Sequence, residues 1–126
     1  MKKVLIVDDS QSWVNYHKAN ILNTYYEVEV DCAYSARQAY DLIFGMVSDP
    51  YNLIITDLNM EYDFEPLYAG EWLIEQIQLL KQYFNTKIYI CSAAYNIKMI
   101  AEHYKVNYIP KALASRNREV YKGLLP

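Results

Sequence analysis

Residues 51–60, YNLIITDLNM, place a run of apolar side chains directly before a carboxylate. Leu53, Ile54 and Ile55 are typical of a strand that is buried on both faces, which is the usual position of a strand in a parallel sheet. A charged group such as Asp57 is costly to bury there without a partner. The stretch therefore predicts a central parallel strand whose carboxyl end presents Asp57 to a site that offsets its charge.

The rest of the chain repeats the same alternation of strand and helix. Further short strands are predicted at residues 4–7, 28–32, 87–91 and 106–110. Amphipathic helices are predicted after each strand, with Ser10 and Ser35 as N-caps of the first two and Gln38 completing a capping box with Ser35. The last of these helices is predicted over residues 114–125, with Ser115 as its cap. Five βα units in succession predict an α/β fold, a doubly wound (βα)5 arrangement around a five-stranded parallel sheet.

Composition indicates one domain over residues 1–126, with no output domain in this chain. The chain carries 21% charged residues and a net charge of −3, without a Lys/Arg-rich block. Nucleic acid and anionic membrane are therefore not expected as direct partners. The apolar runs are about five residues long, too short to cross a bilayer, and the N-terminus does not have the pattern of a signal peptide. We expect a cytoplasmic protein.

Chemically useful side chains follow four of the predicted strands. Asp8 and Asp9 follow the first strand, Asp57 the third, Ser92 the fourth and Lys111 the fifth. In an open parallel sheet the ligand site lies at the carboxyl ends of the strands. These five residues are therefore expected to meet in one cleft.

Such a cleft is suited to a hard cation and a phosphoryl group. Neighbouring carboxylates raise one another's pKa, and a divalent cation removes that conflict. Oxygen ligands favour Mg²⁺ or Mn²⁺ over Zn²⁺. A carboxylate such as Asp57 can act as a nucleophile and form an acyl phosphate, while the metal, Ser92 and Lys111 neutralise or bind the phosphoryl oxygens.

The four motifs VDD, ITDLNM, CSAA and YIPK, in this order and at these strand ends, resemble the receiver domain of bacterial two-component response regulators. The resemblance covers residues 3 to 124. It implies a flavodoxin-like sheet of strand order 2-1-3-4-5. It also implies a signalling phosphoacceptor that catalyses only its own phosphorylation and dephosphorylation.

By position, the resemblance implies that Asp57 is the phosphoacceptor. It implies that Asp9 is the main side-chain ligand of Mg²⁺, that Asp8 binds it directly or through water, and that the backbone carbonyl of Asn59 is a further ligand. The phosphodonor would be a sensor histidine kinase or a histidine phosphotransfer protein.

The resemblance also implies a conformational switch. Ser92 and Lys111 would bind the phosphoryl group, Ser92 would move toward it, and Tyr108 would turn inward as the aromatic switch residue. The face formed by the fourth helix, fifth strand and fifth helix would then change shape for a downstream protein.

The sequence departs from the family in three places, one of which is Glu61 after Met60, where the family usually has proline. Ala112 follows Lys111 where the family commonly has a proline in a cis bond, so Lys111–Ala112 is either trans or a strained cis bond. The segment from Asp57 to Gly70 is about five residues longer than usual. Its extra stretch, EYDFEPLY, is interpreted as a solvated insertion beside the site.

Two alternatives remain open on the sequence alone. The departures at Ala112 and in the extra stretch fit a pseudo-receiver, an interaction module that is not controlled by phosphorylation. An aspartate-nucleophile phosphatase is a weaker alternative, because such enzymes usually carry aspartate where this chain has Asn59. His17 and His103 lie on predicted helices and are interpreted as surface or boundary histidines rather than phosphodonors.

Overall fold

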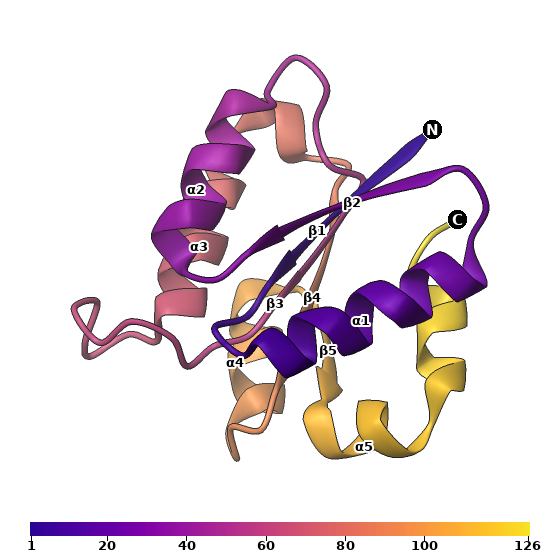
Figure 1. Cartoon of the computed structure of the whole chain (residues 1–126). Coiled ribbons are helices and arrows are strands. Elements are labelled where there is room, and N and C mark those ends of the chain that lie inside the picture. Colours follow the sequence, from indigo (N-terminus) through magenta and orange to yellow (C-terminus); the bar gives the residue numbers. More distant parts are fainter.

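The computed structural model describes all 126 residues and contains one five-stranded sheet (Figure 1). All neighbouring strands are parallel, and their order is β2-β1-β3-β4-β5. The strands are β1 (Lys2–Val7), β2 (Val28–Ala33), β3 (Leu53–Thr56), β4 (Lys87–Ser92) and β5 (Asn107–Pro110). The predicted fold and strand order are therefore confirmed.

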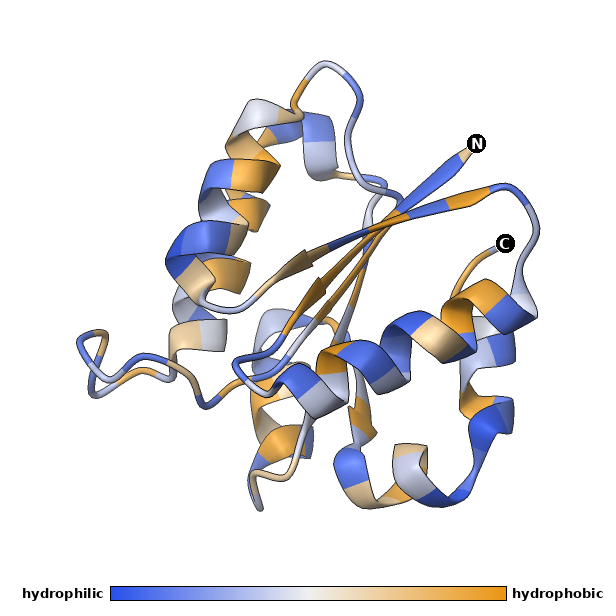
Figure 2. Ribbon diagram, viewed as in Figure 1, coloured by the Kyte–Doolittle hydropathy of each residue, from blue (hydrophilic) through white to orange (hydrophobic).

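Helices cover both faces of the sheet. The α-helices are α1 (Gln11–Thr24), α2 (Ala36–Gly45), α3 (Ala69–Gln78), α4 (Ile97–Tyr104) and α5 (Lys111–Arg116), and the 3₁₀ helices are η1 (Lys81–Tyr83) and η2 (Arg118–Gly123). One core cluster joins α2, α3 and α4 to the sheet, and a second joins α1 and the C-terminal segment to its other face. Apolar residues dominate the strands between these layers (Figure 2). None of the helices combines the length and the apolar composition needed to cross a bilayer.

Local hydrogen bonds explain where the first two helices begin. The Ser10 hydroxyl accepts from the Trp13 N–H, and the Ser35 hydroxyl accepts from the Gln38 N–H, as predicted for N-caps. The second half of the predicted capping box is different, because the Gln38 side chain accepts from the N–H of Tyr34 instead of Ser35.

The C-terminal helix differs from the prediction. It begins at Lys111, directly after β5, and ends at Arg116, and η2 follows after Asn117. Ser115 is therefore not a cap; its hydroxyl donates to the Ala112 carbonyl. Two tyrosine hydroxyls hold this short segment in place: that of Tyr16 on α1 donates to the Ala114 carbonyl, and that of Tyr25, the C-cap of α1, donates to the Tyr121 carbonyl.

His17 is buried, so its interpretation as a surface or boundary residue was wrong. Only 2% of it is exposed, and its Nδ1 atom lies 2.6 Å from the Tyr121 hydroxyl. Burial lowers the pKa of His17 from 6.5 to about 4, and the positive charge of Lys111 acts in the same direction. His103 is exposed on α4.

This burial predicts a loss of stability in acid. The unfolded chain binds a proton at His17 more readily than the folded chain does. The stabilisation that comes from neutral, buried His17 is therefore complete above about pH 6.5 and is lost as the pH falls toward 4. The full loss is about 3 kcal/mol in the free energy of unfolding. About 2 kcal/mol of this loss should appear between pH 7 and pH 5, and urea denaturation at these two pH values measures it.

His17→Gln is the matched control for the acid effect. The difference between the variant and the wild type isolates His17 from Asp8, whose raised pKa acts in the opposite direction. An equal decline of both proteins between pH 7 and pH 5 would show that His17 is not the titrating group.

Candidate functional site

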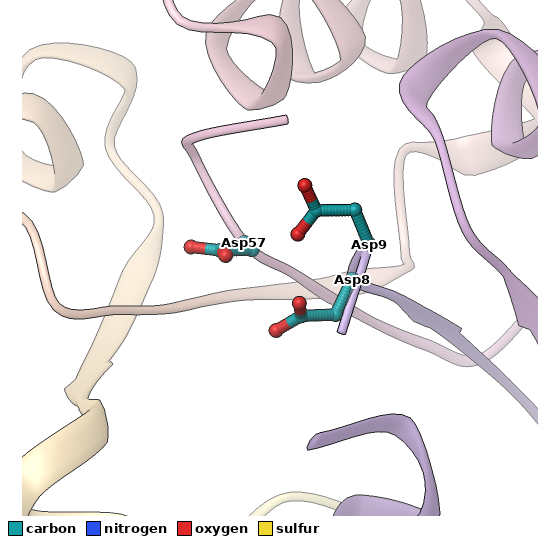
Figure 3. A group of neighbouring side chains, drawn as sticks. All are labelled: Asp8, Asp9 and Asp57. Carbon is teal, nitrogen blue, oxygen red and sulfur yellow. The ribbon is translucent and has the colours of Figure 1, made fainter. Parts of the chain in front are cut away.

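Three carboxylates meet at the carboxyl end of the sheet. Asp8 and Asp9 follow β1, and Asp57 follows β3 (Figure 3). The backbone fixes Asp8 and Asp57, since the Asp8 N–H donates to the Ala33 carbonyl and the Asp57 N–H to the Val7 carbonyl. One oxygen from each of the three carboxylates lies within 4.8 Å of the others. Asp8 and Asp57 are buried and Asp9 is exposed, so the cluster opens to solvent on the side of Asp9.

Lys111 brings one positive charge into this cluster. Its Nζ atom lies 2.9 Å from Asp8 Oδ2 and 2.9 Å from Asp57 Oδ2. The Lys111–Ala112 bond is trans, since the only cis peptide bond is Glu65–Pro66. The first of the two geometries allowed by the sequence is therefore the observed one. Lys111 is the first residue of α5, and this position brings its side chain to the carboxylates without a following proline.

Two buried carboxylates share this single ammonium group. Burial raises the pKa of Asp8, and the charge of Asp57 adds to the effect, although a hydrogen bond from the Ser10 N–H and the contact with Lys111 oppose it. Burial alone would lower the pKa of Lys111, but its close contacts with the Asp8 and Asp57 carboxylates outweigh burial and raise it. Lys111 therefore stays charged, and the site retains an excess of negative charge.

The donor set fits a divalent cation. Asp8 Oδ2 is buried and accepts no hydrogen bond of good geometry, although Lys111 lies close to it. Together with the other two carboxylates it offers hard oxygen ligands, which suit Mg²⁺ or Mn²⁺. The positive charge of such an ion would balance the negative charge of the carboxylates that Lys111 does not neutralise.

A cavity of about 280 Å³ opens beside Asp57. Its lining residues are Asp57, Asn59, Tyr68, Ser92, Ala93, Ala94 and Lys111. Ser92 is buried, and its hydroxyl accepts from the Ala94 N–H at 3.1 Å. Tyr108 lies on β5, is 36% exposed and is not among the lining residues. The structure thus brings Asp8, Asp9, Asp57, Ser92 and Lys111 together, whereas Tyr108 lies outside the cavity.

Three residues at the site were not predicted from the sequence to be part of it. The Trp13 ring lies 5.1 Å from Lys111 Nζ, a distance that gives a cation–π contact. Tyr68 lines the cavity. Gly70 packs against the backbone that follows β3, because a Cβ atom at this position would lie 2.1 Å from the Asp57 carbonyl oxygen. Of these three residues, only Gly70 could have been suspected from the sequence, because it is a glycine at the start of a predicted helix near the site.

Comparison with solved structures identifies the class of fold. The phosphorylated cyanobacterial phytochrome response regulator RcpA is 20% identical, with a TM-score of 0.79 over 97% of this chain and 89% of its own. The response regulator TrrA of Thermotoga maritima, in complex with Mg²⁺ and BeF, is 22% identical, with a TM-score of 0.72 over 97% and 98%. The chemotaxis protein CheY4 of Vibrio cholerae is 24% identical, with a TM-score of 0.69 over 94% and 91%.

These similar structures are response regulator receiver domains, and the chain has their fold. All three identities are below 25%, so the likeness establishes the fold. No protein-family model and no curated protein sequence matches the chain significantly.

Proposed function

We propose that residues 1–126 form one receiver domain that accepts a phosphoryl group on Asp57. The observation that carries this proposal is the buried Asp57 carboxylate at a cavity, 2.9 Å from Lys111 and clustered with Asp8 and Asp9. The donor would be phosphohistidine on a sensor histidine kinase or a histidine phosphotransfer protein. An oxygen of Asp57 forms a bond to phosphorus as the phosphorus–nitrogen bond breaks, and the electron pair of that bond stays on the imidazole.

The residues of the site have separate roles in this transfer. Asp8, Asp9, Asp57 and the Asn59 carbonyl would hold Mg²⁺ or Mn²⁺, which supplies positive charge to the phosphoryl oxygens. Lys111 supplies a second positive charge and Ser92 a hydroxyl donor. Lys111 has to exchange its present contact with Asp57 for a phosphoryl oxygen. Trp13 lies against its ammonium group and limits where that group can go.

The signal would leave the domain through a change of surface. Ser92 would move toward the phosphoryl group, and Tyr108 would turn inward from its exposed position. The face of α4, β5 and α5 would then favour a downstream protein partner, as a shift between two populations. The domain would modify only itself, in the cytoplasm, and would not act on nucleic acid or membrane directly.

Incubation with acetyl phosphate and Mg²⁺ tests the proposal. We expect the intact protein to gain the mass of one phosphoryl group, and to lose it in hydroxylamine. Asp57→Asn should prevent the gain, whereas Asp63→Asn, at an exposed aspartate, should leave it unchanged. No gain by the wild type would favour the pseudo-receiver, especially if a partner binds equally well to Asp57→Ala. Steady turnover of p-nitrophenyl phosphate would favour the phosphatase.

Metal binding gives an independent measurement. Mg²⁺ should raise the temperature of unfolding, because a ligand that binds only the folded state stabilises it by mass action. Asp9→Asn should weaken this effect, and a lower pH should weaken it as well, because protons compete for the carboxylates. A temperature of unfolding that is independent of Mg²⁺ would contradict a metal site here.

A further inference from the structure

Residues 61–68, named here the β3–α3 segment, form the loop that extends beyond the sheet beside the start of α3 (Figure 1). Its first residue is bound to another helix. The Glu61 carboxylate accepts from the Ala36 N–H at 2.8 Å and from the Arg37 N–H at 3.1 Å. These N–H groups belong to the first turn of α2, where a carboxylate is favoured by the helix dipole. The segment is therefore attached to α2, and the solvated insertion predicted from the sequence is only partly solvated.

A second contact attaches the middle of the segment. The Phe64 ring stacks on Trp72 of α3, with ring centroids 4.4 Å apart and an interplanar angle of 20°. The guanidinium of Arg37 lies 4.6 Å from the centroid of the Phe64 ring and also pairs with Asp63. Because the Arg37–Asp63 pair is exposed, the stacking is expected to contribute more to stability than the ion pair does.

The last residue of the segment is held by a hydrogen bond to α3, and α3 packs against the residues that follow β3. Tyr68 precedes α3, and its N–H donates to the Glu71 carboxylate at 2.9 Å. Two residues later, the Gly70 N–H donates to the Leu58 carbonyl at 3.0 Å, and Gly70 packs against the Asp57 carbonyl. These contacts hold the backbone of Tyr68 near Asp57, and the contact of Glu61 with α2 holds the other end of the segment.

Tyr68 stands between two cavities. It lines the 280 Å³ cavity beside Asp57, and it also lines a neighbouring cavity of about 320 Å³. The other lining residues of this second cavity are Asn59, Glu61, Tyr62, Glu65, Pro66, Leu67 and Ala69. Only Asn59 and Tyr68 are shared, so they form the boundary on this side of Asp57. Asn59 is exposed, whereas Tyr68 is half-buried and has the larger side chain.

We propose that the Tyr68 ring restricts the entry of water to phosphorylated Asp57, so that the β3–α3 segment sets the lifetime of the phosphoryl group. This inference rests on the proposed phosphoacceptor function. In hydrolysis a water oxygen bonds to phosphorus, the bond from phosphorus to the Asp57 oxygen breaks, and its electron pair returns to the carboxylate. Both water protons leave with the product as dihydrogen phosphate. Tyr68 is a positioning residue in this scheme and takes no part in bond making.

The test follows the decay of the phosphorylated protein. Wild type, Tyr68→Ala, Tyr68→Phe and Tyr62→Ala are loaded with acetyl phosphate and Mg²⁺, separated from the donor, and followed by intact mass. Tyr68→Ala should lose its phosphoryl group about tenfold faster, which corresponds to about 1.4 kcal/mol in activation free energy. Tyr68→Phe should decay like the wild type, because the ring is retained. Tyr62 is 74% exposed and does not line the Asp57 cavity, so Tyr62→Ala should also decay like the wild type.

A second pair of variants tests the attachment of the segment. Glu61→Ala removes the contact with α2 and should accelerate decay, whereas Asp63→Ala removes only an exposed ion pair and should not. Urea denaturation of each protein checks that faster decay does not follow general loss of stability.

The possible failures can be told apart. If the wild type takes up no phosphoryl group, the proposed function fails and this inference fails with it. If all proteins load equally and Tyr68→Ala decays no faster than the wild type, the role of Tyr68 alone is wrong. It is also wrong if Tyr68→Phe decays as fast as Tyr68→Ala, because the hydroxyl and not the ring would then be responsible.

Discussion

Gly70→Ala is expected to lower the free energy of unfolding by about 3 kcal/mol, at the upper end of the range for overpacking. The added Cβ would lie 2.1 Å from the Asp57 carbonyl oxygen and 2.8 Å from the Leu58 Cα. Both atoms belong to the backbone, so no side chain can rotate away to make room. Relief requires α3 to move from the end of β3, and that movement would displace Asp57 as well. Urea denaturation measures the loss, and acetyl phosphate labelling measures the accompanying damage to the site.

Gly45→Ala is the matched control for this experiment. Gly45 ends α2, no atom lies within 4 Å of the position of an added Cβ, and its φ angle is not positive. Alanine should therefore be neutral there, or stabilising by up to about 1 kcal/mol, because glycine is the weaker helix former. Equal stabilities of Gly70→Ala and Gly45→Ala would contradict the close contact between α3 and the backbone that follows β3.

Lys111→Ala should lower the free energy of unfolding by about 3 kcal/mol when no divalent cation is present, because it leaves two buried carboxylates without a positively charged partner. Lys111 is the only cation paired with Asp8 and Asp57. Mg²⁺ should stabilise this variant more than it stabilises the wild type, since no ammonium group competes for the carboxylates. Thermal unfolding with and without Mg²⁺ measures both effects. Labelling by acetyl phosphate should be slower in the variant.

Lys122→Ala provides the comparison. Lys122 pairs with Glu119 at the surface, and both side chains are 67% exposed, so the variant should stay within about 0.5 kcal/mol of the wild type. A similarly small effect at Lys111, or an unchanged response to Mg²⁺, would show that its two ion pairs do not neutralise the site.

The architecture and most of the site could be predicted from the sequence, for a physical reason. A strand such as Leu53–Thr56 is short, apolar and followed by polar residues. Its position and its carboxyl end can therefore both be predicted from the sequence. Once five such strands are parallel, topology alone brings Asp8, Asp57 and Lys111 to one edge. This inference needs no knowledge of side-chain conformations, and the observed distances agree with it.

The remaining features depend on contacts between distant segments, which periodicity does not reveal. The early end of α5 and the burial of His17 both arise from the packing of α1 against the C-terminal segment, where His17 contacts Tyr121. The composition of the β3–α3 segment indicated a polar loop, but its attachment depends on Glu61 meeting the start of α2. The close approach of Gly70 to Asp57 likewise depends on how α3 packs in the folded protein, which the sequence pattern does not reveal.

The most direct test of the central claim is to locate the modified residue. Protein treated with acetyl phosphate and Mg²⁺ is reduced with sodium borohydride, which converts an acyl phosphate to an alcohol and leaves free carboxylates intact. The peptides are then sequenced by mass spectrometry. We predict homoserine at position 57 and an unchanged aspartate at positions 8, 9 and 63, with no conversion when Mg²⁺ is chelated. Unmodified Asp57, or conversion at another carboxylate, would contradict the assignment of Asp57 as the phosphoacceptor.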